Sequence, residues 1–309
     1  MKKIFLLFTA AVLSAGMMTA QDINQATEMY NNGAMELQMG NTEIALGHFQ
    51  NALAMAETLG EEGAEMAANC KSYIPQLMES IAKGLIKAED YDGALAKLAE
   101  AIETAELYGA ADVVEDCKEL IPSVYLSKGN DLLKAKNVTA AVEAFQKTIE
   151  IDPANGKAYL LLGQSFMAQG NIAEAEAAYL QAAANGQEKN ATKQLSNMYL
   201  KKAQAALKTK KAQEAYDYAL KANSFLENAN AYKIAASAAQ QLGNNADCIV
   251  NYEKYLEANP KAKDAAGVRF TIGALYQQAG NKAKAKEFYQ MVATDPQYGP
   301  SAQEQLKTL

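Results

Sequence analysis

The sequence predicts an all-α fold of about seven helix-turn-helix units that stack along the chain. Three observations support this prediction. Ala, Leu, Glu, Lys and Gln, which lose little entropy in a helix, dominate the 309 residues. Proline is scarce, with 6 residues, and Trp is absent. Small residues recur at fixed positions within segments of roughly 34 residues, as expected for a repeat protein.

Residues 1–20 have the pattern of a secretory signal peptide. Lys2 and Lys3 form a positive start, and an apolar stretch of about signal-peptide length follows. Cleavage is expected after Gly16 or after Ala20. A membrane anchor is the less favoured alternative, because the apolar run is short for a span and no second span follows. No Cys lies near the cleavage positions, which argues against a lipoprotein anchor. We therefore expect a soluble mature chain in the periplasm or outside the cell.

Charge is unevenly distributed along the chain. The net charge is −7, and it becomes −9 without the two lysines of the signal peptide. Residues 21–121 hold 5 Lys and 19 acidic residues, whereas residues 122–309 hold 22 basic and 17 acidic residues. Such asymmetry can orient a partner or a second copy, although solvated helix faces are the simpler explanation of any single charge. The acidic total and the single Arg argue against a nucleic-acid partner.

Residues 156–187 show the repeating unit most clearly. Apolar residues recur three or four positions apart on both sides of Gly170 and Asn171, which is the spacing of one helix face. Glycine suits the position after a helix, and asparagine suits the N-cap of the next helix. The segment is therefore expected to form two amphipathic helices joined by a tight turn.

The same pattern recurs in seven units, numbered here from the first residue of each. Place 8 is always small: Gly33, Ala82, Gly129, Gly163, Ala203, Ala236 and Gly273. Place 20 is also small: Ala45, Ala94, Ala141, Ala175, Ala215, Cys248 and Ala285. Place 24 is aromatic in five of the seven: Phe49, Leu98, Phe145, Tyr179, Ala219, Tyr252 and Tyr289. We expect the small residues to mark the helix crossing and the aromatic ring to fill the wedge to the next helix.

These residues resemble the tetratricopeptide repeat, a helix-turn-helix unit of 34 residues. The resemblance is strong in units 122–155, 156–189, 229–262 and 266–299, and weaker in units 26–59, 75–108 and 196–229. In the last of these, Ala219 replaces the aromatic residue and Lys210-Lys211 replace Gly-Asn. The resemblance implies a right-handed superhelical solenoid over residues 21–309, with a capping helix at 301–308.

Two related hexapeptides, CKSYIP at 70–75 and CKELIP at 117–122, lie in extra segments between units. We expect a further helical segment to lead up to each proline. Pro75 and Pro122 then either begin the next helix, where proline is tolerated, or kink one long helix.

Cys70 and Cys117 admit three interpretations. A disulfide would suit an oxidising compartment, but equivalent points of stacked repeats lie farther apart than a disulfide allows. A metal site lacks further ligands, because His48 is the only His and no CxxC motif occurs. Burial as small apolar groups is the favoured interpretation, for Cys248 as well.

Catalytic motifs are absent from the sequence, and we expect neither an enzyme nor a bound cofactor. His48 has no nucleophile in a recognisable motif, and Asp90 and Asp92 suit helix capping better than catalysis. The basic stretch 201–211 is interpreted as a solvated helix face and turn; contact with an acidic partner, or with the acidic half of another copy, is the alternative.

The resemblance places the first helix of each unit on a concave face, with places 2, 5, 9, 12 and 13 directed inward. In the strong units these places supply the candidate partner-binding residues Leu126, Asn130, Lys134, Lys157, Leu160, Gln164, Met167, Lys233, Ser237, Gln240, Phe270 and Gln277. This mixed apolar and amide lining suits an extended or helical peptide. Leu126 and Leu160 stand where the carboxylate-gripping repeats need a basic residue, so that specificity is not transferred.

The leading prediction is a non-enzymatic extracytoplasmic scaffold that binds a protein or peptide on the concave face. The alternative is an envelope component that assembles with itself through its acidic and basic halves. A third hypothesis is an enzyme or small-molecule binder that uses the hollow of the solenoid. No membrane span is expected after removal of the signal peptide.

Overall fold

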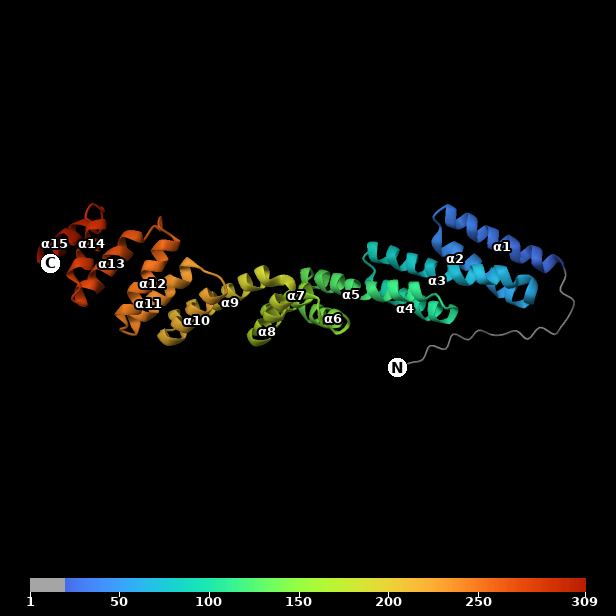
Figure 1. Cartoon of the computed structure of the whole chain (residues 1–309), viewed down its shortest axis with the longest axis horizontal. Coiled ribbons are helices and arrows are strands. Elements are labelled where there is room, and N and C mark those ends of the chain that lie inside the picture. Colours follow the sequence, from blue (N-terminus) through green and yellow to red (C-terminus); the bar gives the residue numbers. More distant parts are fainter. Residues whose placement is uncertain (1–19) are drawn as a thin grey trace. The chain divides into compact units, whose positions relative to one another are not determined.

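The computed structural model describes residues 20–309, which are helical apart from turns and short connections (Figure 1). The predicted signal peptide lies outside the described residues except for Ala20, which begins the first helix. Within the described range, no helix is both long and apolar enough to cross a membrane.

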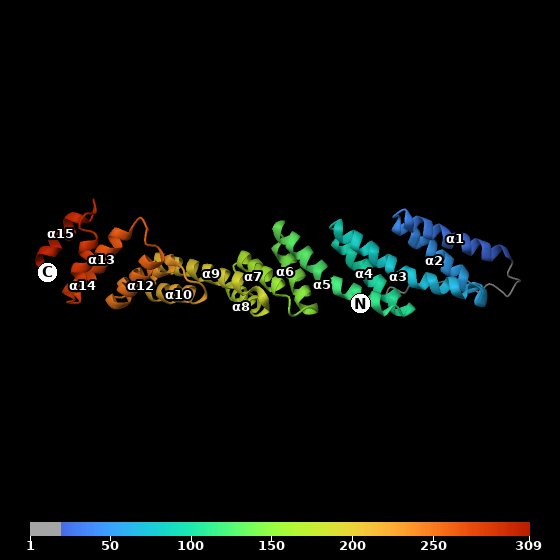
Figure 2. The ribbon, with the colours of Figure 1, turned by 45° about the horizontal axis from the view of Figure 1, so that its top comes forward.

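The chain divides into two compact units, one ending at Pro153 and the other running from Ala154 to Leu309. We call residues 20–153 the N-terminal unit. It contains three helix pairs, α1 (Ala20–Gln38) with α2 (Thr42–Thr58), α3 (Ala64–Lys87) with α4 (Tyr91–Tyr108), and α5 (Ala111–Lys134) with α6 (Val138–Ile151). A short 3-10 turn, Gly60–Gly63, precedes α3. Each helix packs against its neighbour in sequence, as Figure 2 shows for α3 and α4.

Residues 154–309 form the C-terminal unit, which holds four pairs and a final helix. The pairs are α7 (Gly156–Gln169) with α8 (Ile172–Ala182), α9 (Glu188–Lys208) with α10 (Ala212–Phe225), α11 (Ala229–Gln241) with α12 (Asn245–Ala258), and α13 (Ala265–Gln278) with α14 (Lys282–Met291). The final helix α15 (Gly299–Thr308) packs on α14 and confirms the predicted capping helix. The all-α repeat fold of seven helix pairs is thereby confirmed.

The turns inside the pairs share one geometry. Gly170 has a φ of 81°, and its N–H bonds the Met167 carbonyl while that of Asn171 bonds the Phe166 carbonyl. The other predicted Gly-Asn turns also have a positive φ at glycine, which confirms the sequence assignment. Three turns use an ordinary residue instead, Glu89, Lys136 or Lys210, at φ between 59° and 63°. An L-residue there carries a steric cost that glycine does not.

Small residues at the crossing allow an aromatic ring to lie against the neighbouring helix. Places 8 and 20 are buried in every unit. A Cβ added to Gly129 would lie 2.7 Å from the Phe145 ring, and one added to Gly163 would lie 2.6 Å from the Tyr179 ring. Where place 8 carries a methyl group, as in Ala82, the partner at place 24 is the smaller Leu98. Within a pair, an aromatic ring at place 24 therefore packs against glycine at place 8, and an aliphatic side chain packs against alanine. The pair of Ala236 and Tyr252 is the exception.

The two hexapeptides lie within long helices. Pro75 and Pro122 are inside α3 and α5, each of 24 residues, so the alternative in which these prolines begin a helix is wrong. The extra segments are the first halves of these helices and run on through the proline. The lysine of each hexapeptide ties its helix to the preceding one, through Lys71–Glu57 at 2.8 Å and Lys118–Glu106 at 3.4 Å.

The three cysteines, Cys70, Cys117 and Cys248, are free and 0% exposed, which confirms the packing interpretation. Burial raises the pKa of each thiol to about 11. These thiols are therefore protonated at neutral pH and poor nucleophiles.

Candidate functional site

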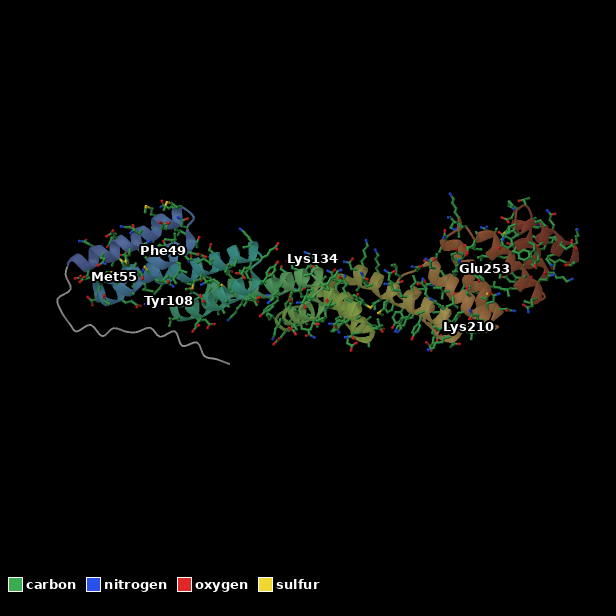
Figure 3. The ribbon with its side chains drawn as sticks, turned by 180° about the vertical axis from the view of Figure 1, so that it is seen from behind. Phe49, Met55, Tyr108, Lys134, Lys210 and Glu253 are labelled. Carbon is green, nitrogen blue, oxygen red and sulfur yellow. The ribbon has the colours of Figure 1, made fainter. Side chains whose placement is uncertain are left out.

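The predicted binding residues of the N-terminal unit lie along α5. Leu126 and Asn130 are half-buried, and Lys134 is exposed near the end of the helix (Figure 3). Lys134 Nζ lies 2.8 Å from Asp131 Oδ1, and Tyr91 donates to Asp131 Oδ2 at 2.5 Å. The hydrogen bonds from Lys134 and Tyr91 lower the pKa of Asp131. Lys134, the only charged residue of the three, is thus neutralised by the Asp131 carboxylate of the same helix.

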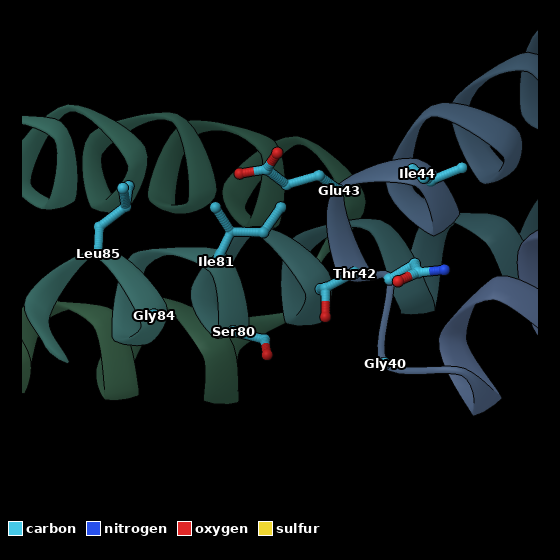
Figure 4. Close-up of a pocket in the computed structure, with 9 residues that line it drawn as sticks. Gly40, Thr42, Glu43, Ile44, Ser80, Ile81, Gly84 and Leu85 are labelled. Atoms are coloured by element: carbon cyan, nitrogen blue, oxygen red, sulfur yellow. The ribbon is translucent and has the colours of Figure 1, made fainter. Parts of the chain in front are cut away.

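A hollow of about 410 Å³ in the N-terminal unit contains none of the predicted residues. Figure 4 shows Ser80, Ile81, Gly84 and Leu85 along α3, beside residues 40–44, which form the turn before α2 and its first residues. The Asn41 amide at its edge donates to Glu36 Oε2 at 2.7 Å. Asn41, Thr42, Glu43 and Ser80 are its polar lining residues, and Ile44, Ile81 and Leu85 are its apolar ones.

A second hollow lies in the C-terminal unit and contains two predicted residues. It measures about 180 Å³, and we call it the α7–α9 pocket. Its lining consists of Gln164 and Met167 of α7, Tyr179 of α8, and Gln194, Asn197, Met198 and Lys201 of α9. Gln164 and Met167 stand at places 9 and 12 of their unit. The pocket therefore lies on the face that the repeat pattern assigns to the first helices of the pairs.

Tyr179 reaches this pocket because Gly163 has no side chain. The tyrosine belongs to α8, and its ring, 2% exposed, occupies the space where a Cβ of residue 163 would stand. Its hydroxyl makes no hydrogen bond to any described residue, so the pocket is its open side. Burial raises the pKa of Tyr179 to about 12, which keeps the hydroxyl protonated and able to donate.

The α9 side of the pocket is one helix face. Gln194, Asn197, Met198 and Lys201 follow the i, i+3, i+4, i+7 spacing. Met198 is buried and forms the floor, whereas the amides and the ammonium group are more open. Our sequence analysis missed Gln194, Asn197 and Met198, because the unit that begins at residue 196 has one of the weaker repeat patterns. Lys201 belongs to the basic stretch 201–211, for which contact with an acidic partner was the alternative interpretation. The i, i+3, i+4, i+7 spacing, which places these side chains on one helix face, was the sequence signal that could have identified them.

The pocket is positively charged although the chain is acidic. Lys201 is its only charged lining residue, and no Asp or Glu is present. Neither Lys201 nor the three amides, Gln164, Gln194 and Asn197, has a hydrogen-bond or ion-pair partner among the described residues. Lys201 and Asn197 are exposed and Gln164 and Gln194 are half-buried, so these four donor side chains face solvent and are free to bind a ligand.

Two further predicted residues lie on α7 at different depths. Lys157 is exposed. Leu160 is only 9% exposed and belongs to a core cluster with Tyr179 and Leu195. Leu160 therefore contributes to stability and offers a partner little surface.

On α11, two of the three predicted residues are engaged within the protein. Lys233 Nζ lies 2.6 Å from Asp264 Oδ2, and Tyr255 donates to Asp264 Oδ1 at 2.6 Å. Burial raises the pKa of Asp264, but the hydrogen bonds from Lys233 and Tyr255 outweigh it, and the net shift is downward. Ser237 Oγ lies 3.5 Å from Tyr252 Oη, whereas Gln240 is exposed.

On α13, the chain's own C-terminal segment covers the predicted face. The Phe270 ring lies 5.4 Å from that of Tyr289 and 5.7 Å from that of Tyr298, measured between centroids. Gln277 accepts a hydrogen bond from Tyr289 at 2.7 Å. Phe270 and Gln277 are therefore occupied by intramolecular contacts.

Tyrosines at place 24 distinguish the C-terminal unit. The Tyr252 hydroxyl reaches Ser237 and that of Tyr289 reaches Gln277, both of which are predicted binding residues, and Tyr179 lines the pocket beside Gln164. In the N-terminal unit the same place is Phe49, Leu98 or Phe145, none of which has a hydroxyl. Sequence analysis treated these tyrosines only as rings that fill the core. The choice of tyrosine over phenylalanine, which adds a hydroxyl, was the signal that could have identified them as polar contacts.

In residues 20–309, no three His, Cys, Asp or Glu side chains are grouped as metal ligands. The chemistry that the α7–α9 pocket offers is hydrogen bonding and charge attraction, not metal coordination.

Comparison with known proteins identifies the repeat over part of the chain. Residues 126–190 match the model of the tetratricopeptide repeat family. The matched segment runs from α5 into α9, and it contains the Gln164, Met167 and Tyr179 side of the pocket. No curated protein sequence matches the chain.

Solved structures with similar folds are distant. The crystal structure of MamA has 19% identity, covers 59% of this chain and 97% of its own, and has a TM-score of 0.32. YrrB, titled a TPR protein with an unusual peptide-binding site, has 18% identity, coverages of 65% and 97%, and a TM-score of 0.34. The Cut9–Hcn1 complex has 15% identity, coverages of 92% and 76%, and a TM-score of 0.31. At these values we transfer no property of those proteins to this chain.

Proposed function

We propose that this protein is a non-enzymatic scaffold that binds a protein or peptide segment along the first helices of its C-terminal unit. The observation that supports this most is the α7–α9 pocket, where four polar side chains from two repeats converge without internal partners. Amide and ammonium donors of this kind suit the carbonyl and carboxylate groups of a polypeptide. The tetratricopeptide repeats of residues 126–190 favour the same function, because helix-lined grooves commonly bind peptide segments.

The test is a pull-down from an extract of the source cells with a triple variant of the pocket. Gln164→Ala, Met167→Ala and Asn197→Ala together should abolish capture of the partner, because they remove lining atoms and leave Leu160 in the core. The matched control changes exposed residues of α8, namely Glu174→Ala, Leu180→Ala and Gln181→Ala. Equal capture by both variants would show that the pocket is not the binding surface.

An extracytoplasmic location is part of the proposal, and it rests on the signal-peptide pattern of residues 1–20. The measurement is cell fractionation with N-terminal sequencing of the recovered protein. We expect a chain that begins at residue 17 or 21 in the periplasm or the medium. An intact N-terminus in the cytoplasm would contradict this location.

Self-assembly remains a second candidate, favoured by the net charge of −14 in residues 21–121 and +5 in residues 122–309. Attraction between exposed charges weakens with salt, since the screening length falls from about 10 Å at 0.1 M to about 3 Å at 1 M. Light scattering should then show an oligomer that dissociates as salt rises. A monomer at every salt concentration would remove this candidate.

A further inference from the structure

The α7–α9 pocket has a composition that selects one kind of group in a bound polypeptide. We propose that it takes the side-chain carboxylate of an Asp or Glu residue, with Lys201 as the charge partner. This inference rests on the proposed function and names the specificity of that site.

Charge is the first argument. The lining has one ammonium group and no carboxylate, in a protein whose net charge is −7. Some lysines of the C-terminal unit are neutralised internally, such as Lys221 by Glu176 at 2.8 Å and Lys233 by Asp264 at 2.6 Å, whereas Lys201 lines the pocket. Lys201 has no such partner among the described residues. An incoming carboxylate would supply the missing charge.

Hydrogen bonding is the second argument. A carboxylate has two acceptor oxygens with about four lone-pair sites, which is more than one ammonium group satisfies. Besides Lys201, the pocket is lined by Gln164, Gln194 and Asn197, each with an amide, and by Tyr179, whose hydroxyl is protonated. These groups donate to the remaining lone pairs, while the Met167 and Met198 side chains contact the methylene groups of the ligand.

Size is the third argument. The pocket volume of about 180 Å³ lies below the roughly 300–1,000 Å³ of typical small-molecule sites, so it suits one side chain rather than a whole metabolite. Further polar groups of the predicted face follow on α11, where Ser237 is half-buried and Gln240 is exposed. A bound chain that also contacts α11 would continue past the pocket and would present a side-chain carboxylate rather than a C-terminal one.

The experiment uses randomised octapeptides blocked by N-acetylation and C-amidation, so that Asp and Glu are the only carboxylates. The full chain is immobilised, and the composition of the retained peptides is measured. We expect Asp and Glu to be enriched over Asn and Gln on the wild-type protein. Lys201→Met should remove this enrichment, whereas Lys189→Met, an exposed lysine of α9 outside the pocket, should leave it unchanged.

One selected peptide is then measured with Glu and with Gln at the enriched position. We expect the Glu peptide to bind at least about tenfold more tightly to the wild type, and about equally with its Gln counterpart to Lys201→Met. Tyr179→Phe keeps the ring over Gly163 and removes only the hydroxyl, so it should weaken the Glu peptide several-fold. Thermal melts followed by circular dichroism confirm that each variant is folded.

The outcomes separate this inference from the proposed function. Peptides retained without acidic preference, or with a preference that persists in Lys201→Met, would overturn the pocket's specificity and leave the groove function standing. A preference that appears only when the C-terminus is left free would also overturn it, because the ligand would then be a chain end. Failure to retain any peptide would remove the groove function and this specificity together.

Discussion

Glycine at the helix crossing leads to a prediction that the structure makes quantitative. In Gly129→Ala the new Cβ would lie 2.7 Å from Phe145 Cε1, whereas ordinary contacts begin at 3.4 Å, so the ring must move by about 0.7 Å. Overpacking of this kind costs about 1–3 kcal/mol, and the better helix propensity of alanine recovers about 1 kcal/mol. We expect a net loss of about 0–2 kcal/mol in the free energy of unfolding.

The matched control is Gly84→Ala in α3, within the same unit. Nothing lies within 4 Å of a Cβ added there, so the helix propensity acts alone and stability should rise by about 0.5–1 kcal/mol. The assay is urea unfolding of the full chain followed by far-UV circular dichroism, with the transition of the N-terminal unit fitted separately.

A double variant tests the reason for the effect. Gly129→Ala with Phe145→Leu reproduces the Ala82 and Leu98 combination found in the preceding pair. It should be more stable than the sum of the two single effects by about 1 kcal/mol. If Gly129→Ala were as stable as Gly84→Ala, or if the double variant were merely additive, the ring-to-glycine packing would not account for the small residue.

Three other predictions follow from particular contacts. Lys210→Gly should stabilise the chain by up to about 1 kcal/mol in thermal unfolding, because Lys210 has a φ of 59°; Lys208→Gly in the adjoining helix should destabilise it, and the same sign for both would contradict the turn argument. Burial raises the pKa of Glu176, but hydrogen bonds from Lys221 and Tyr199 outweigh it, so the pKa is lowered from the ordinary 4.5. A lowered carboxyl pKa stabilises the fold above the unfolded value, and this is lost as pH falls through the folded value. Glu176→Gln should therefore cost about 1 kcal/mol at neutral pH and nothing in strong acid; a cost independent of pH would disprove the ionic origin. Finally, Cys70, Cys117 and Cys248 should resist iodoacetamide at mildly alkaline pH and react in urea, since burial raises their thiol pKa values to about 11; rapid labelling of the folded chain, read by mass spectrometry, would refute this.

The repeat was predictable because its determinants are local. Gly-Asn pairs specify four of the turns, and small residues at places 8 and 20 specify the crossings, so the helix pairs follow from local spacing; the capping helix was expected from the resemblance. Local sequence could not decide whether Pro75 and Pro122 begin a helix or lie inside one. A proline both begins helices and survives within them, and here the contacts of the long α3 and α5 decide in favour of continuity.

The binding face was predicted less completely, because the burial of each side chain depends on residues of the neighbouring repeats. Leu160 and Gln164 both stand at inward places of α7, yet Leu160 joins a cluster with Leu195 while Gln164 lines the pocket. Phe270 is covered by Tyr298, which comes from the end of the same unit, after its second helix. Tyr179 was assigned to the core, and its ring is indeed there; only the structure shows that the residue, packed over Gly163, also lines the pocket.

The central claim, that the first helices of the C-terminal unit hold a polypeptide, is tested most directly by photo-crosslinking in the cells that make the protein. A photoreactive phenylalanine analogue is placed at Gln164 in the pocket, or at Glu174 on the exposed face of α8. We predict a crosslinked polypeptide from position 164 that is absent from position 174. Crosslinks from position 174 alone, or equal crosslinks from both positions, would contradict the claim.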